Sequence, residues 1–151
     1  NSFGFFNGTP VVSDATVYFG SINGQFSALK TSGELIWESP VGLQGTPLLI
    51  SNSVFLISGR NNLIRINKSD GSLIWSTSLG KTNALENYFN PVLMGSKIWV
   101  ASSDGLLRSF EVSNGNTVDS IKSFVSYAGP PIPYLDGFML YSASGKFFGF
   151  E

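Results

Sequence analysis

The sequence predicts an all-β fold of the propeller class, with about four blades of four antiparallel strands in 151 residues. The first observation is a repeat of about 40 residues, because a proline opens each of four similar units, at Pro10, Pro47, Pro91 and Pro131. The second is a closing phrase shared by two units, Gly33-Glu34-Leu35-Ile36-Trp37 and Gly71-Ser72-Leu73-Ile74-Trp75. The third is composition, since 13 Phe, 17 Gly and only 13% charged residues suit pleated strands joined by frequent turns. Strand-rich repeats of this length are typical of propellers and solenoids.

Each unit reads as a series of short strands. In the first unit, strands are predicted over 10–12, 16–20, 25–30 and 34–39, with Asn23-Gly24 as a hairpin turn. In the second unit they are predicted over 46–50, 54–58, 63–67 and 72–78. The third unit is predicted to have strands over 91–94, 97–102, 106–112 and 116–124, with Asp104-Gly105 as a hairpin turn and Asp119 where the earlier units have Trp. The fourth is predicted to have three, over 131–134, 138–142 and 146–151, and lacks an outer strand.

These strands define four blades, approximately 9–42, 45–80, 89–124 and 129–151, that together make a partial β-propeller over residues 1–151. No repeat of this kind buries its apolar face alone, and an unpaired strand edge is rarely left open. We therefore expect the chain to be part of a ring of about eight blades, completed by another half or by self-association at the open blade edges.

Composition argues against several classes of function. The net charge is −1 and no basic stripe is visible, so a nucleic acid is not expected as a partner. No apolar run is long enough to suggest a membrane-spanning helix. The chain has no His and no Cys, so Ser-His-Asp and Cys-His arrangements cannot form within it. No acidic cluster has calcium-binding spacing, and we expect no catalytic residue, cofactor or metal.

The repeats resemble those of quinoprotein-type (PQQ-like) β-propellers, on the closing phrase with Gly33 and Trp37 and the preceding Ala28-Leu29-Lys30. Within that superfamily the chain resembles the C-terminal half of the BamB family, the propeller lipoprotein of the outer-membrane β-barrel assembly machinery. Asn90-Pro91-Val92-Leu93 through Phe110 is similar to the family's penultimate blade, whose outer strand also tends to lose its Trp. The ending Phe147-Phe148-Gly149-Phe150 is similar to that of its last blade, which in the family an N-terminal strand completes.

The resemblance implies a non-catalytic periplasmic scaffold, held at the outer membrane by a lipid anchor upstream of this chain. It implies binding to a barrel-assembly outer-membrane subunit, possible contact with unfolded outer-membrane proteins, and assistance in their assembly and insertion. Two alternatives stay open: a fragment of a PQQ-dependent dehydrogenase-like enzyme, and a ligand-binding or sensor propeller. Shared fold alone is weak evidence of shared function.

The repeat positions Trp37, Trp75, Gly33 and Gly71 are interpreted as structural, with each Trp packed between neighbouring blades rather than stacked on a ligand. Three connections between blades carry aromatic residues and are expected on one rim, where exposed rings would bind a protein partner. The partner-binding candidates are Phe5, Phe6, Asn7, Tyr88, Phe89 and Tyr127. The alternative is that these rings fill gaps between blades.

Overall fold

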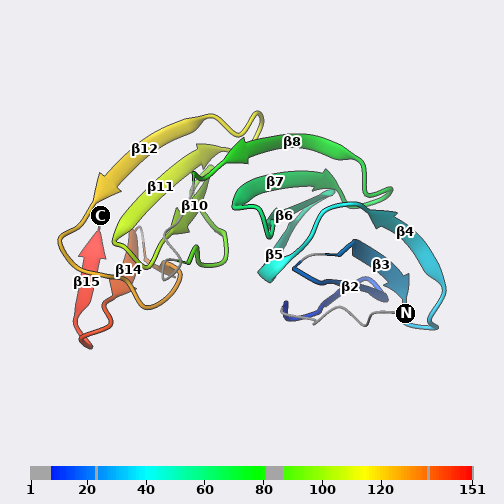
Figure 1. The fold of residues 1–151 in the computed structure, drawn as a ribbon, viewed down its shortest axis with the longest axis horizontal. Helices are drawn as coiled ribbons and strands as arrows, with labels where there is room; N and C mark the ends of the chain where they lie inside the picture. The colour runs from blue at the N-terminus through cyan, green and yellow to red at the C-terminus, as the bar shows by residue number, and fades with distance from the viewer. Residues whose placement is uncertain (1–7, 23, 81–86, 136, 151) are drawn as a thin grey trace. The chain divides into compact units, whose positions relative to one another are not determined.

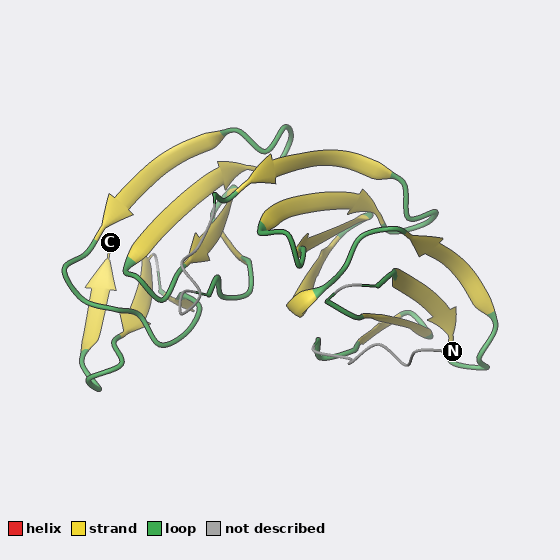
Figure 2. Cartoon of the chain, in the orientation of Figure 1, coloured by secondary structure: helices red, strands yellow, loops and turns green. Residues whose placement is uncertain are grey.

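The computed structural model describes residues 8–22, 24–80, 87–135 and 137–150. Within these ranges every regular element is a β-strand, and the strands form four antiparallel sheets (Figure 2). The predicted all-β architecture, with four sheets of which the last has three strands, is confirmed. The chain divides into two compact units, Asn1–Gly80 and Lys81–Glu151, which we call unit 1 and unit 2.

Unit 1 holds two four-stranded sheets, each with its strands in chain order (Figure 1). The first sheet consists of β1 (Val11–Ser13), β2 (Thr16–Gly20), β3 (Phe26–Lys30) and β4 (Leu35–Ser39). The second consists of β5 (Gln44–Ile50), β6 (Ser53–Ile57), β7 (Asn62–Asn67) and β8 (Leu73–Ser78). Strands that neighbour in sequence pair through short hairpins, as expected of a blade.

Unit 2 holds a four-stranded and a three-stranded sheet of the same meander order. The first consists of β9 (Val92–Met94), β10 (Lys97–Ala101), β11 (Leu106–Glu111) and β12 (Thr117–Lys122). The second consists of β13 (Ile132–Tyr134), β14 (Gly137–Tyr141) and β15 (Phe147–Phe150). Every boundary of the fifteen strands lies within two residues of its predicted position.

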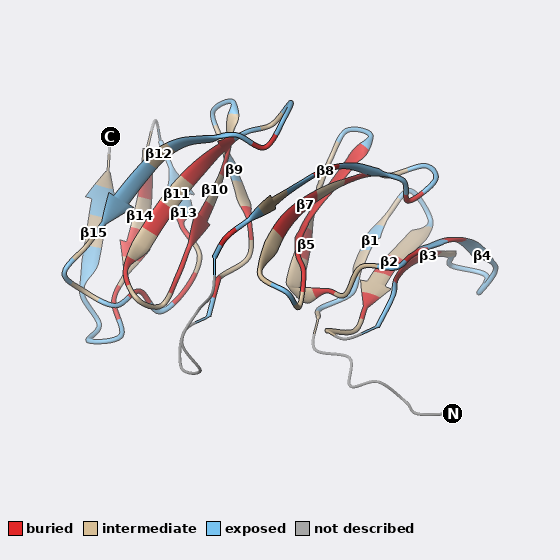
Figure 3. Ribbon diagram, turned by 45° about the horizontal axis from the view of Figure 1, so that its top comes forward, coloured by how far each residue is buried: buried red, intermediate tan, exposed pale blue. Residues whose placement is uncertain are grey.

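In each unit, apolar side chains of the middle strands form the core, and the last strand of each four-stranded sheet is more exposed (Figure 3). The core of unit 1 joins its two sheets, because it combines Tyr18, Phe26 and Trp37 with residues of β6 and β7. The core of unit 2 likewise combines residues of β10 and β11 with Phe138 and Leu140 of β14. The sheets within a unit are therefore stabilised mainly by burial against each other.

A β-bulge recurs in the pairing of the third and fourth strands of three sheets. It gives these sheets a common register, in which Trp37 lies opposite Ala28, Trp75 opposite Arg65, and Asp119 opposite Ser109. Asp119 thus takes the position that Trp has in the two earlier sheets, as the sequence predicts.

The hairpin at Asp104-Gly105 is one residue longer than a two-residue turn. The backbone N–H of Ser102 donates to the carbonyl of Leu106 (2.8 Å), and that of Gly105 donates to the carbonyl of Ser102 (3.0 Å). Of the Asp104-Gly105 pair, only Gly105 has a positive φ, +86°, so glycine is needed at the last turn position. Asn23 of the equivalent turn in unit 1 lies outside the described residues.

Candidate functional site

The partner-binding candidates do not all lie where the sequence placed them. Phe5, Phe6 and Asn7 lie outside the described residues. Tyr88 and Tyr127 are buried in unit 2, with 8% and 2% of their surface exposed. The expectation of exposed rings at these two positions is therefore corrected, and little of either side chain is open to a partner.

The backbone explains this burial, because both tyrosines lie on short extensions of an inner strand. Tyr88 pairs across an isolated bridge with Ser102, and Tyr127 does so with Ser142. The side chain of Tyr88 also lies against Arg108, whose Nη2 donates to the Tyr88 hydroxyl at 3.3 Å. Phe89, next along the chain, is partly buried and packs on the core of unit 2.

Phe124 is an exposed aromatic residue that the sequence reasoning did not select. Its side chain is fully exposed, in the link that joins β12 to β13. Val125 is partly buried and Tyr127 is buried, so the link follows the two-residue alternation of an extended chain. That alternation, applied to 123–128, is the signal that distinguishes Phe124 from Tyr127.

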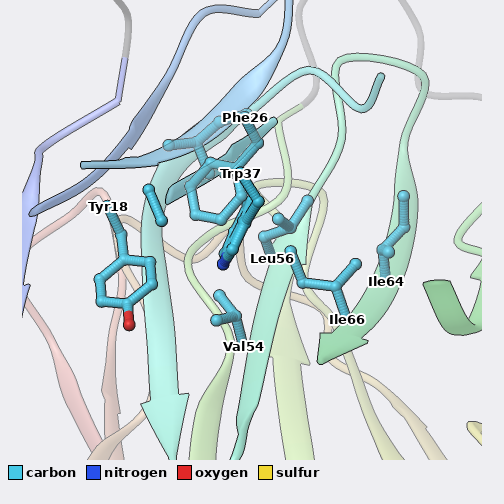
Figure 4. Close-up of a cluster of buried hydrophobic side chains, with 9 residues drawn as sticks. Tyr18, Phe26, Trp37, Val54, Leu56, Ile64 and Ile66 are labelled. Carbon is cyan, nitrogen blue, oxygen red and sulfur yellow. The ribbon is translucent and has the colours of Figure 1, made fainter. Parts of the chain in front are cut away.

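Trp37 occupies the space between the two sheets of unit 1 (Figure 4). Its ring centroid lies 6.0 Å from that of Tyr18 and 5.8 Å from that of Phe26, both in tilted geometry. The indole Nε1–H donates to the backbone carbonyl of Lys68 (3.0 Å), which belongs to the β7–β8 turn of the other sheet. Trp75 is also buried, and its ring lies 5.9 Å from Phe55.

Gly33 and Gly71 occupy the same kind of turn but differ in surroundings. Both have positive φ, +92° and +72°, a backbone region that favours glycine. A Cβ at Gly71 would lie 2.5 Å from Cε3 of Trp37, whereas one at Gly33 would meet nothing within 4 Å. Gly71 thus allows the turn of the second sheet to close over the Trp37 ring of the first.

The same turn forms polar contacts to the first sheet. Lys68 Nζ forms an ion pair with Asp14 Oδ2 (3.0 Å) and donates to Ser13 Oγ (3.1 Å), and it lies 5.9 Å from the Tyr18 ring centroid. The hydrogen bonds from Lys68 and Ser13 lower the pKa of Asp14. The β7–β8 turn is therefore joined to the first sheet by the hydrogen bond from the Trp37 indole to the Lys68 carbonyl and by the ion pair of Lys68 with Asp14.

In unit 2, where Asp119 replaces the Trp, a polar cluster forms instead. Asp119 Oδ2 accepts from Ser109 Oγ (2.6 Å) and from Lys97 Nζ (2.9 Å). These two hydrogen bonds, that from Ser109 foremost, lower the pKa of the Asp119 carboxyl. The cluster is partly exposed, so it stabilises the unit far less than a buried indole would.

Larger rings at other register positions compensate for the missing indole. Trp99 takes the position of Tyr18, Phe138 that of Val54, and Phe150 that of Ile66. The Trp99 and Phe138 ring centroids are 5.1 Å apart, and Phe138 stacks on Phe150 at 4.9 Å. A cavity of about 690 Å³, lined by these three rings and by Lys97 among others, remains between the two sheets of this unit.

Four aspartates have pKa values below the ordinary value. The pKa values of Asp14, Asp70, Asp104 and Asp119 are all lowered, so these carboxylates are ionised at neutral pH. A general acid requires the opposite shift. Among the described residues, no three His, Cys, Asp or Glu side chains come together as a metal site. A search of the same residues finds no helix that is long and apolar enough to span a membrane.

Comparison with known families identifies these repeats. The profile of the family described as "Outer membrane protein assembly factor BamB" matches residues 3–126. The chain belongs to this family. The assembly factor BamB of Yersinia pestis is 25% identical over 145 residues, which are 94% of this chain and 36% of that protein. The chain thus spans about a third of the length of the curated relatives that it matches.

Solved structures agree with the fold. BamB from Moraxella catarrhalis aligns with a TM-score of 0.77 and 21% identity over 93% of this chain and 41% of that one. The computationally designed Ika4 protein aligns with a TM-score of 0.79 and 12% identity, over 99% of this chain and 92% of that one. At these identities the likeness concerns fold alone, and it supports the predicted resemblance to the BamB propeller.

Proposed function

We propose that this chain is part of a non-catalytic periplasmic scaffold that binds the outer-membrane β-barrel assembly machinery and assists the assembly and insertion of outer-membrane proteins. The observation that carries the proposal is the family match over residues 3–126, together with relatives that are named as outer-membrane protein assembly factors. Attachment to the outer membrane through an upstream lipid anchor belongs to the same proposal. So does completion of the blades by another part of the full-length protein.

The packed cores and the exposed links of the structure support a scaffold role. Each unit is a pair of sheets with a continuous apolar core, which suits a fixed platform for loops. Phe124 presents a full aromatic ring on one such link. Exposed aromatic residues are frequent anchors in protein interfaces, and one can contribute about 2 kcal/mol or more when an interface buries it.

The test is capture of the barrel-assembly complex, from detergent-solubilised envelopes of the source organism, by tagged full-length protein. We expect specific capture by the wild type and weaker capture by Phe124→Ser. Phe147→Ser is the matched control, because it removes another exposed Phe from an edge strand of the same unit. Absence of the complex from the wild-type eluate would contradict the proposed function.

A second variant, Phe5→Ser/Phe6→Ser, tests the candidates that lie outside the described residues. The segment Phe5-Phe6-Asn7-Gly8 contains no charged residue, so the proposed contact is apolar and hydrogen-bonded. We expect this pair to weaken capture equally at low and high salt, since no ion pair is involved. Unchanged capture by a folded variant would move the contact elsewhere.

A further inference from the structure

A polar cavity of about 440 Å³ lies in unit 1, where three loops meet. The loops are the β2–β3 turn, the link between the two sheets, and the β6–β7 turn. Ile22 and Gly24 line it from the first, Gly42 from the second, and Ser58 and Arg60 from the third. None of these residues belongs to the aromatic candidates considered above.

The walls of this cavity are held by close backbone packing. The carbonyl oxygen of Ile22 lies between Gly42 and Gly59, where an added Cβ would be 2.0 Å and 2.2 Å from it. Positive φ is observed at neither glycine, so the close approach itself excludes a larger residue. The backbone N–H of Leu43 donates to the carbonyl of Ser21 (2.8 Å), which joins the link to the first turn.

The turn that carries Arg60 is fixed by a buried hydroxyl. Ser58 Oγ accepts from the backbone N–H groups of Arg60 (3.3 Å) and Asn62 (3.2 Å). The backbone N–H of Asn61 donates to the carbonyl of Ser58 (2.9 Å). The backbone of this wall is therefore formed before any ligand arrives, which lowers the entropic cost of binding.

Arg60 is the one charged residue among those that line the cavity. Its side chain is exposed and has no hydrogen bond or ion pair within the described part of the chain. Two other cations of unit 1 are engaged: Arg65 lies over the Phe55 ring, and Lys68 pairs with Asp14. A guanidinium carries five N–H donors in a planar fork that matches a carboxylate.

We propose that this cavity, the Arg60 pocket, binds a carboxylate side chain of a protein partner. The proposal rests on the proposed function only in taking the partner to be a protein. The charge is complementary, no acidic residue is among those that line the pocket, and the backbone of the turn that carries Arg60 is already in place. The fork of Arg60 donates two hydrogen bonds to the carboxylate, and the polar walls accept the peptide that carries it.

The first experiment needs no knowledge of the partner. The full-length protein, labelled with ¹⁵N on arginine side chains, is titrated with the peptide acetyl-Glu-Glu-Glu-Glu-amide. The matched probes are acetyl-Gln-Gln-Gln-Gln-amide and inorganic phosphate at equal ionic strength. We expect a saturable shift of the Arg60 Nε–Hε signal with the Glu peptide, at least about tenfold weaker binding of the Gln peptide, and loss of the response in Arg60→Gln.

Two variants test whether the peptide is bound by the guanidinium fork of Arg60 or only by positive charge. Arg60→Lys keeps the charge but loses the fork, so it should bind the Glu peptide severalfold more weakly than the wild type. Lys146→Glu is the control, because Lys146 is another exposed cation without a described partner, on the β14–β15 hairpin of unit 2. It changes the net charge more than Arg60→Gln does and should leave peptide binding unchanged.

Two results would overturn the proposal: equal binding of the Glu and Gln peptides, or an unchanged Glu response in Arg60→Gln. A response to phosphate as strong as that to the Glu peptide would also contradict it, since the pocket would then be a general anion site. Capture of the barrel-assembly complex is measured separately with the same variants. Failure of the wild type to capture the complex would refute the proposed function while the peptide titration still decides the Arg60 pocket.

Discussion

Trp37→Ala should be among the most destabilising single substitutions in unit 1. The indole is 7% exposed and packs on Tyr18 and Phe26. A Trp side chain buries roughly 200 Å². At about 25 cal/mol per Å², its loss removes about 5 kcal/mol of apolar burial, and the retained Cβ reduces this to about 4 kcal/mol. The carbonyl of Lys68 also loses its hydrogen bond from Nε1, which adds about 1 kcal/mol. We expect a decrease of about 3–5 kcal/mol in the free energy of unfolding, as for other Trp→Ala changes in cores.

The assay is urea denaturation of the full-length protein, followed by far-ultraviolet circular dichroism, with the slope of the transition compared between variants. Trp37→Phe is the intermediate variant, since it keeps a ring in the core but removes the Nε1 donor, and it should fall between wild type and Trp37→Ala. Asp119→Ala changes the register-equivalent residue of a partly exposed polar cluster and should cost much less. A loss below about 1 kcal/mol for Trp37→Ala, at an unchanged slope, would refute the reasoning that this ring holds the two sheets together.

Three further outcomes are expected. Gly33→Ala should lower the free energy of unfolding by about 1 kcal/mol, because of the positive φ alone. Gly71→Ala should lower it by about 2 kcal/mol more, because its Cβ would also meet Trp37; equal losses for the two variants would contradict that contact. Tyr127→Phe should leave the thermal midpoint unchanged or raise it, because the buried hydroxyl has no described hydrogen-bond partner; a clear decrease would show that it has one. Burial raises the pKa of Asp104, but hydrogen bonds from Lys122 and Ser102 outweigh it and leave the pKa below 3.8. This carboxylate therefore stabilises the fold above pH 3.8, and its contribution is lost as the pH falls through the lowered pKa. In acid denaturation curves, Asp104→Asn should reduce stability at neutral pH and make the loss of stability at acid pH less steep.

The strands could be predicted because their signals are local. A proline directly precedes three of the four inner strands, and Pro47 lies within β5; glycines with positive φ mark turns, as at Gly33 and Gly71. Such signals depend on φ and on backbone donors, which a residue imposes wherever it lies. The period of about 40 residues then groups the strands into sheets without knowledge of any long-range contact.

Burial at the links could not be predicted in the same way, because it depends on register across a sheet. Leu43, Tyr88 and Tyr127 occupy equivalent buried positions ahead of an inner strand, but the residues between them and the following proline differ in number. The distance in sequence from the proline therefore does not show which of these link residues faces the core. The Arg60 pocket could not be predicted for a related reason, since its three loops are distant in sequence and meet through glycine backbone packing and a backbone hydrogen bond.

The replacement of Trp by Asp119 shows a second limit. The sequence reveals the loss of the indole, but the compensating rings at Trp99, Phe138 and Phe150 lie on three other strands. Only the pairing register shows that they occupy positions held by smaller residues in unit 1. The three larger rings thus occupy part of the space around the missing indole, and the cavity of about 690 Å³ beside them shows that they do not fill all of it.

The contact between Trp37 and Gly71 also bears on how such a chain can be rearranged. The two residues belong to different sequence repeats, yet each limits what the other can be. A repeat cut at its prolines would carry the indole without the glycine turn that closes over it. For a designer who shuffles or duplicates blades, the segment to exchange therefore runs from Trp37, in the middle of outer strand β4, to Gly71, in the turn before outer strand β8. Covariation between those two positions, rather than within either repeat, is the pattern that homologous sequences should show.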